Sequence, residues 1–297
     1  MTATEQPISL YAMAKINLYL HITGLRKNGY HDLDSLVTFA GIYDTVHLVP
    51  SDELSLVVKG PFRKQLPLVK NNIVLKAATT LKKVTGSKAG VQITLEKNLP
   101  VASGIGGGSM DCAAALKGLI KFWNIDASTI DLLRLGLRLG SDVPICLFGQ
   151  TAFISGRGEI ITKALTLPKI WFVLVNPGVE LSTKAVFESH KVNSSNQCSK
   201  LGQFDKNPAT AIELANLLSY RNNDLTEAAI NLQPVIKKAL LSIQDTENVL
   251  VSRMAGSGAT CFGVYKDYDS AKNAAKYLNN RYPNWWICPA PIINNLK

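Results

Sequence analysis

The chain has 297 residues, of which 46% are hydrophobic and 18% are charged, enough for one large or two ordinary domains; this composition excludes global disorder, and no apolar run reaches the roughly 18 residues of a membrane span. The formal net charge is +10 with dispersed lysines, a pattern that favours a small polyanionic substrate over nucleic acid. Five scattered cysteines without a Cys-x-x-Cys pair, and an N-terminus without an apolar signal region, predict a reduced, cytoplasmic protein.

The first predicted element is a strand over 8–23. Lys15 and Asn17 are two residues apart, so they share one face of this strand, opposite a face that carries Ile16 and its apolar neighbours. A solvated sheet face is the simpler interpretation of such a pair. Further strands are predicted over 46–49 and 54–58.

A helix is predicted next, with Asn72 as its N-cap and Gly86 at its end. It is followed by alternating apolar residues that predict a strand over 91–95. Four glycines then fall within residues 104–108, and an apolar pattern over 116–123 predicts a second helix.

A glycine-rich loop that begins a helix presents free N–H groups and the positive end of the helix dipole, which suits a phosphate. A plain strand-to-helix turn is the alternative, but it needs only one or two glycines. The loop is neither a Walker loop nor a dinucleotide-binding loop, since Ser109 stands where the latter needs its last glycine. We expect Gly107→Val to abolish ATP binding and leave the fold largely intact, because its β-branched side chain would block the approach of a phosphate to the backbone.

The middle of the chain predicts a helix over 129–139 that begins in a capping box, Ser128 to Asp131. Pro144 disfavours a helix at Val143, and the following residues predict a hairpin of strands over 145–148 and 151–155. A domain boundary is predicted near 163–168. The remaining predicted elements are a strand over 171–175, a helix over 183–190, a polar mobile loop over 191–207, helices near 209–219 and 234–246, a glycine turn that enters a strand within 254–264, a helix near 269–280 and a strand over 285–288.

Residues 100–112 resemble the Pro-x-x-x-Gly-Leu-Gly-Gly-Gly-Ser-Ser-Asp-Ala signature of the galactokinase–homoserine kinase–mevalonate kinase–phosphomevalonate kinase superfamily. The resemblance extends to Ala-Lys-Ile-Asn-Leu at 14–18, Gly-Ser-Asp-Val-Pro at 140–144, Asn-Pro-Gly-Val at 176–179 and Gly-Ser-Gly-Ala at 256–259. It therefore covers nearly the whole chain.

The resemblance implies an α+β fold of two domains with the active site in the cleft between them. Residues 1–165 would form an N-terminal ATP-binding domain, of a kind also found in ribosomal proteins. Residues 166–297 would form a C-terminal α/β sandwich that completes the substrate site.

The resemblance also implies an ATP-dependent small-molecule kinase with ATP and Mg²⁺ as cofactors. Asp142 matches the catalytic base, and Lys15 matches the cation that keeps the base ionised and favours the alkoxide. Met110 replaces a serine of the signature, and a thioether is a poor Mg²⁺ ligand, so no metal ligand is assigned. The residues that match the ATP side are Asn72, Lys97, Pro100, Val101, Ala102, Ser103, Gly104, Ile105, Gly106, Gly107, Gly108, Ser109 and Met110.

Gly29-Tyr30-His31 resembles one branch of the superfamily, whose members phosphorylate the 2-hydroxyl of a methylerythritol carried on cytidine diphosphate, in the non-mevalonate isoprenoid pathway. In that branch Tyr30 and Phe187 match the rings that stack on cytosine, and His31 matches the partner of the base edge. Asn17 and Thr183 match residues near the diphosphate and the erythritol. Phe187 as an ordinary core residue is the simpler alternative.

Three other functions stay open from the sequence. A homoserine or mevalonate kinase of the same superfamily is disfavoured by Tyr30 and His31. A basic RNA-binding protein leaves the glycine loop and Asp142 unexplained. A catalytically inactive relative that senses ligand is disfavoured by the presence of both Lys15 and Asp142.

Overall fold

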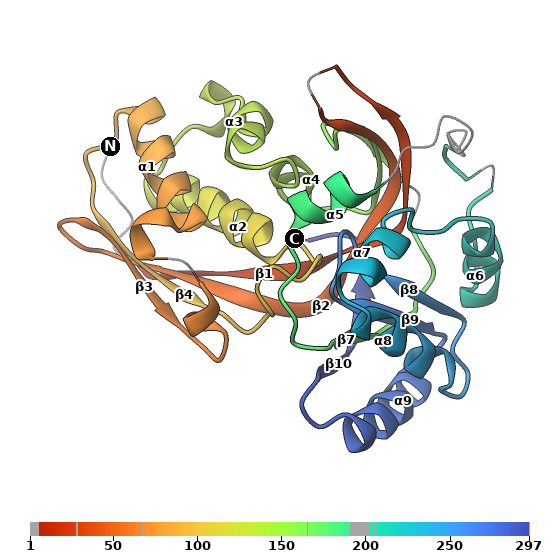
Figure 1. The fold of residues 1–297 in the computed structure, drawn as a ribbon. Helices are drawn as coiled ribbons and strands as arrows, with labels where there is room; N and C mark the ends of the chain where they lie inside the picture. The colour runs from red at the N-terminus through yellow and green to blue at the C-terminus, as the bar shows by residue number, and fades with distance from the viewer. Residues whose placement is uncertain are drawn as a thin grey trace. The chain divides into compact units, whose positions relative to one another are not determined.

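A computed structural model describes residues 6–296 except 28, 67, 165, 191–201 and 205 (Figure 1). The chain divides into two compact units, each made of several stretches. We call them the first unit (1–14, 42–101 and 106–148) and the second unit (15–41, 102–105 and 149–297). Among the described residues, none of the helices has the length and apolarity to cross a membrane.

Two long strands, β1 (Ile8–Leu25) and β2 (His31–Val49), run through both units. The predicted strand over 46–49 is therefore the end of a much longer one. Polar residues such as Asp34 and Ser35 interrupt the apolar alternation of β2, yet both are buried, which hides the strand from its pattern. The predicted division at residue 165 follows neither unit and stays a prediction.

The first unit is a small sheet with helices packed on it. β4 (Val91–Glu96) pairs antiparallel with the end of β2 and parallel with β3 (Leu54–Lys59). Two helices, α1 (Ile73–Thr85) and α2 (Gly107–Phe122), contact each other in this unit (Figure 1). The other elements of the unit are the short turns η1 (Arg63–Gln65), η2 (Val69–Asn71) and η3 (Ala127–Thr129), and helices α3 (Leu132–Leu139) and α4 (Val143–Phe148).

The sequence predicted both ends of α1. Asn72 is its N-cap and accepts a hydrogen bond from the backbone N–H of Val74 at 2.9 Å. Gly86 ends the helix in the left-handed conformation, with φ +67°.

Two predictions around α3 and α4 are wrong. The helix predicted over 129–139 begins only at Leu132, because Asp131 itself is the N-cap and the residues before it form η3. The strand predicted over 145–148 is the helix α4. Pro144 is its second residue, within the first turn, where the missing N–H costs nothing, so it begins this helix rather than excluding it.

The second unit contains the beginning of β2, which pairs antiparallel with β5 (Ala152–Gly156) and, near its middle, with β10 (Trp286–Ile293). β5 forms its hairpin with β6 (Ile160–Lys163) and not with the preceding segment. From β10 the antiparallel order continues through β7 (Trp171–Asn176) and β9 (Cys261–Tyr265) to β8 (Val251–Met254).

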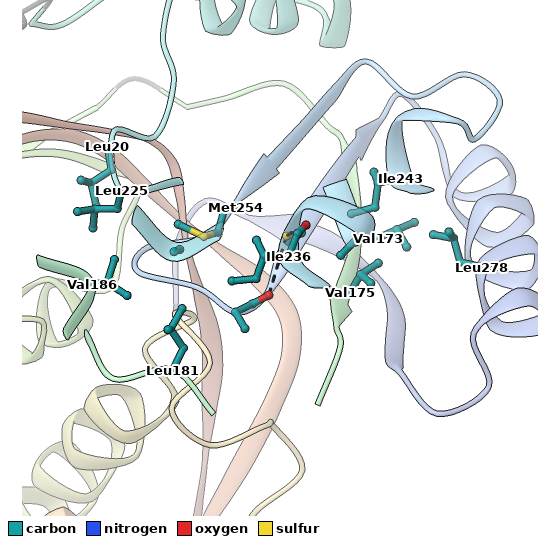
Figure 2. Packing of buried hydrophobic residues seen from close by; sticks show 14 of the residues in the cluster. Leu20, Val173, Val175, Leu181, Val186, Leu225, Ile236, Ile243, Met254 and Leu278 are labelled. Carbon is teal, nitrogen blue, oxygen red and sulfur yellow. Dashed lines mark hydrogen bonds between the residues drawn. The ribbon is translucent and has the colours of Figure 1, made fainter. Parts of the chain in front are cut away.

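The helices of the second unit enclose its apolar core. They are α5 (Thr183–Ser189), α6 (Ala211–Ser219), α7 (Thr226–Leu232), α8 (Val235–Gln244) and α9 (Tyr268–Arg281). Figure 2 shows part of this core, where Val175, Ile236 and Met254 come together from a strand, a helix and the end of another strand. The predictions missed α7 and β8, and most of the loop predicted over 191–207 lies outside the described residues.

Candidate active site

The glycine-rich loop leads directly into α2. Gly106 precedes the helix in the left-handed conformation, with φ +65°, and no side chain caps the helix among the described residues. The N–H groups of the first turn of a helix have no acceptor within the helix. This start of α2 therefore has the donors that the phosphate-binding interpretation requires.

Gly107 and Gly108 differ in what a side chain would meet. A Cβ on Gly107, which is buried, would lie 3.1 Å from the ammonium nitrogen of Lys97. A Cβ on exposed Gly108 would meet only Ile73 Cγ2, at 3.9 Å. The expectation that Gly107→Val leaves the fold largely intact stays a prediction, but the contact with Lys97 counts against it, because that side of the helix faces the interior. Gly108 is the glycine whose missing side chain leaves exposed space.

Lys97 lies under the start of α2, with its side chain buried. Its ammonium binds the carboxylate of Asp44 and, at 2.7 Å, Oδ2 of Asp111. The second oxygen of Asp44 accepts the backbone N–H groups of Asn98 and Leu99, at 2.5 and 2.8 Å. One buried cluster thus ties the end of β4 and the beginning of the glycine loop to α2.

The charges of this cluster are not balanced, since two carboxylates face one ammonium. Burial raises the pKa of Asp111 to about 7, although Lys97 acts in the opposite direction. Burial alone lowers the pKa of Lys97, but the carboxylates of Asp111 and Asp44 outweigh it, and the net shift is upward. Oδ1 of Asp111 is buried without a hydrogen-bond partner among the described residues. Asp44 was not among the predicted residues, and Asp111 was quoted only as part of the glycine-loop signature, because nothing in the local sequence shows that either carboxylate contacts Lys97.

Asp142 lies in the first unit, half-buried, in the turn between α3 and α4. This turn is closed by hydrogen bonds from the N–H of Val143 to the carbonyl of Gly140, at 3.1 Å, and from the N–H of Cys146 to the carbonyl of Asp142, at 3.3 Å. The carboxylate is therefore presented by a short turn with a fixed backbone. Lys15, its predicted partner, belongs to the second unit.

In the second unit, Lys15 and Asn17 are almost completely buried on β1. The backbone N–H of Lys15 donates to the carbonyl of Ile105, at 2.9 Å, so β1 is attached to the glycine loop. Asn17 donates from Nδ2 to Ser35 at 2.9 Å. Its Oδ1 has no hydrogen-bond partner among the described residues, although it is buried. A buried acceptor without a donor is costly, so Asn17 has the character of a group that binds a ligand hydroxyl or N–H.

The second glycine turn supports the first. A Cβ on Gly104 would lie 2.3 Å from the carbonyl oxygen of Ala255, and one on Gly256 would lie 2.6 Å from the carbonyl oxygen of Gly104. The backbone N–H of Thr260 donates to the carbonyl of Ser103, at 3.0 Å. The two glycine motifs thus need their glycines because the backbones touch.

Asn223 holds the second glycine turn, a role that the sequence analysis missed. Its buried side chain donates to the carbonyls of Met254 and Gly256, at 2.9 and 2.7 Å, and accepts the N–H of Leu225. Near the same turn, Thr183 and Ser257 join their hydroxyls at 2.8 Å. Nothing in the sequence around Asn223 indicates that its side chain binds a turn 31 to 33 positions later in the chain.

The predicted aromatic residues come together in part. The rings of His31 and Phe187 lie 5.3 Å apart, with His190 at 6.4 Å from His31. Burial, and then the nearby His190, lower the pKa of His31, which favours its neutral form. Tyr30 is half-exposed, and the guanidinium of Arg157 lies over its ring, 4.7 Å from the centroid. Arg157 was not among the predicted residues.

The described residues contain no group of three or more His, Cys, Asp or Glu side chains that could hold a metal ion. Mg²⁺ in nucleotide sites commonly keeps several waters and binds to phosphates with only one or two protein ligands. The loop offers the hydroxyl of Ser109 for this purpose, next to the thioether of Met110. Because a thioether is a poor Mg²⁺ ligand, the hydroxyl is the usable donor of the two, and it fits an ion that is brought by the nucleotide rather than one held in a dedicated cage.

Models of known protein families match this chain in two places. The family model "GHMP kinases N terminal domain" matches residues 72–150, and "GHMP kinases C terminal" matches residues 203–284. The chain belongs to the GHMP kinase family. The first match of this GHMP kinase includes α1, the glycine loop and the turn of Asp142, and the second includes Asn223 and the second glycine turn.

Named relatives are similar over nearly the full chain. The 4-diphosphocytidyl-2-C-methyl-D-erythritol kinase of Paramagnetospirillum magneticum is 47% identical over 286 residues, which cover 96% of this chain and 99% of the relative. The enzyme of the same name from Rhodospirillum rubrum is 42% identical, covering 96% of this chain and 92% of the relative.

Solved structures are similar to this GHMP kinase over nearly its whole length. A crystal structure of 4-(cytidine 5'-diphospho)-2C-methyl-D-erythritol kinase superposes with a TM-score of 0.75 at 27% identity, covering 96% of this chain and 99% of the other. Homoserine kinase from Cytophaga hutchinsonii has a TM-score of 0.76 at 16% identity, covering 100% and 98%, and this likeness concerns the fold alone. The two-domain kinase fold predicted from the sequence is confirmed.

Proposed function

We propose that this GHMP kinase transfers the γ-phosphoryl group of ATP to the 2-hydroxyl of 4-diphosphocytidyl-2-C-methyl-D-erythritol. The identity of 42–47% over nearly full length to enzymes of that name carries this proposal. The products are ADP and the 2-phosphate of the acceptor, which is a step of non-mevalonate isoprenoid synthesis. The net charge of +10 suits an acceptor that carries a diphosphate.

Phosphoryl transfer requires donors for the phosphates, neutralisation of their charge and a group that orients or deprotonates the hydroxyl. We assign the first requirement to the glycine loop and the first turn of α2, with Asn72 and Lys97 on the ATP side. In this assignment the backbone of the loop contacts ATP, while the buried cluster of Lys97, Asp44 and Asp111 keeps the loop in place. Mg²⁺ would supply further positive charge when it arrives with the nucleotide.

The third requirement is assigned to Asp142, which would accept the proton of the 2-hydroxyl. The ammonium of Lys15 would stabilise both the carboxylate of Asp142 and the developing alkoxide, because an opposite charge favours both anions. Substitution of either residue should lower kcat much more than it raises the KM for ATP.

The acceptor is assigned to the second unit. Tyr30 and Phe187 would stack on cytosine, and neutral His31 would pair with the base edge. Asn17 is the best supported of the polar contacts, because its buried Oδ1 has an unused acceptor position. Thr183 would contact the acceptor through the hydroxyl that it now directs at Ser257.

The experiment that tests this function is an ADP-release assay with three acceptors, namely the cytidine-linked methylerythritol, homoserine and mevalonate. Turnover of the first at a kcat/KM at least about a hundredfold above the others is the expected result. Preference for homoserine or mevalonate would leave the family assignment in place and reject the acceptor. RNA binding without ADP release would reject the kinase activity itself.

We further propose a cytoplasmic location, on the basis of the composition and cysteine usage.

A further inference from the structure

A set of contacts formed by four residues surrounds Tyr30, and the function proposed above assigns no role to these four: Arg26, Asp32, Arg157 and Glu159. The backbone N–H of Arg26 donates to the carbonyl of Tyr30 at 2.7 Å, and the N–H of Gly29 donates to the carbonyl of Arg26 at 2.9 Å. These two bonds close the turn that carries Tyr30. The side chain of Arg26 then binds Asp32, with Nε 2.8 Å from Oδ1.

The same arginine connects this turn to the β5–β6 turn. The guanidinium of Arg26 binds Oε1 of Glu159 at 3.3 Å, and the other oxygen of Glu159 accepts the backbone N–H of Arg157. Gly156 has φ +68°, and a Cβ there would lie 2.7 Å from Oε2 of Glu159, so glycine is needed for Glu159 to fold back. The backbone of Arg157 is thereby fixed relative to Tyr30.

Arg157 itself contacts the ring of Tyr30. Its guanidinium carbon lies 4.7 Å from the centre of the Tyr30 ring, within the range of a cation–π contact. Arg157 therefore covers one face of the Tyr30 ring. Nε of Arg157 is buried without a hydrogen-bond partner among the described residues.

We infer that Arg157 is a positioning residue for the acceptor, which acts by holding the ring of Tyr30 in the orientation that stacks on the base. This inference rests on the proposed function. Without Arg157 the half-exposed Tyr30 ring loses the contact that covers one of its faces, so its orientation becomes less defined and binding of the acceptor has to restore it. The loss should appear in acceptor binding and not in ATP binding, because both residues lie outside the glycine loop.

Two substitutions distinguish the effect of the positive charge of Arg157 from the effect of its side-chain volume. Arg157→Met keeps most of the length of the side chain and removes the cation, so we expect the KM for the cytidine-linked acceptor to rise about three- to tenfold. The KM for ATP and kcat should stay within about twofold. Arg157→Lys keeps a cation that can lie over the ring and should restore most of the affinity. The matched control is Arg281→Met, which removes an exposed arginine 5.8 Å from the ring of Tyr282 and should change neither KM.

A double substitution tests whether Arg157 acts through Tyr30. In a Tyr30→Ala background the further change Arg157→Met should alter the KM for the acceptor by less than about twofold, because the ring that it positions is gone. If the two effects instead multiply, Arg157 contacts the substrate directly and the positioning role is wrong. If Arg157→Met alone has no effect on the acceptor, the inference is also wrong.

A measurement without any acceptor keeps this result separate from the proposed function. In protein labelled with ¹³C on its nine tyrosines, the signal of Tyr30 is the one lost in Tyr30→Phe. Arg157→Met should move that ring signal, whereas Arg281→Met should not. A ring signal that shifts in a protein that fails to use the cytidine-linked acceptor would reject the function and retain the contact. An unshifted signal in an enzyme that does use the acceptor would reject the contact alone.

Discussion

Adjacent glycines at the start of α2 give a direct test of the phosphate cradle. In Gly107→Ala, the new methyl would lie 3.1 Å from the ammonium of Lys97, about 0.3 Å closer than the 3.4 Å at which an ordinary contact begins. That ammonium cannot move freely because it is bound to two buried carboxylates. Overpacking of this kind costs about 1–3 kcal/mol, and the gain of alanine over glycine in a helix returns roughly 0.5–1 kcal/mol.

Gly107→Ala should therefore lower the free energy of unfolding by about 1–2 kcal/mol. Gly108→Ala should leave it unchanged or raise it by up to about 1 kcal/mol, since its methyl makes only an ordinary contact. The methyl of Gly108→Ala, however, projects from the exposed side where phosphates would approach. Loss of one hydrogen bond to a charged phosphate, about 1.5–3 kcal/mol, corresponds to a rise of roughly 10- to 150-fold in the Kd for ATP.

Thermal unfolding and titration with a fluorescent ATP analogue measure the two effects separately on both variants. The reasoning predicts opposite profiles, with Gly107→Ala losing stability and Gly108→Ala losing nucleotide affinity. Gly108→Ala protein that binds the analogue like the unsubstituted chain would show that this turn does not hold phosphates. Gly107→Ala protein with unchanged stability would show that Lys97 is not held as tightly as the structure indicates.

Three further predictions follow from the same geometry. Asp142→Asn should lower kcat by roughly 10²–10⁴ with little change in the Kd for ATP, and a steady-state assay that finds kcat within about threefold of the original excludes Asp142 as the base. Tyr30→Ala should raise the KM for the cytidine-linked acceptor by about one to two decades, because stacking on the base is lost. His31→Ala should reduce the preference for the cytidine acceptor over its uridine analogue more than Tyr30→Ala does. Measurement of kcat/KM for both acceptors in the two variants tests this. Burial raises the pKa of Asp111 to about 7, above its ordinary value of 3.8. Between these two pH values the folded chain therefore binds more protons than the unfolded chain, and the free energy of unfolding falls as the pH rises. Asp111→Asn removes that fall, so the variant should be more stable relative to the unsubstituted chain at pH 8 than at pH 5 in denaturant titrations, and an equal difference at both pH values contradicts the shift.

Local signals in the sequence were sufficient for much of the fold. Asn72 and Gly86 predicted the two ends of α1, since capping depends on a residue and its immediate neighbours. The glycine loop and its helix were predicted for the same reason. Pro144 misled because its effect depends on where in a helix it falls, and the residues around it did not show that α4 begins at Val143.

The parts of the site that the sequence did not predict depend on contacts between distant segments. Asp44 meets Lys97 across 53 positions of the chain, and Asn223 meets Gly256 across 33. Arg157 reaches Tyr30 only because β5 pairs with β2. None of these pairings leaves a periodic pattern, so only the folded chain brings them together. The roles of the predicted catalytic and ligand-binding residues stay predictions.

The proposed reaction transfers a phosphoryl group from ATP to the 2-hydroxyl of a cytidine-linked methylerythritol. The most direct measurement is ³¹P NMR of a reaction that contains the purified chain, ATP, Mg²⁺ and that acceptor. We expect one new phosphomonoester signal that grows in step with ADP and is absent when homoserine or mevalonate replaces the acceptor. The signal should show no splitting by a vicinal proton, because the carbon that bears the 2-hydroxyl carries the methyl group and no hydrogen, whereas a phosphate on another hydroxyl of the erythritol would be split. ADP formation without that signal, or a phosphomonoester at another hydroxyl, would contradict the proposed reaction.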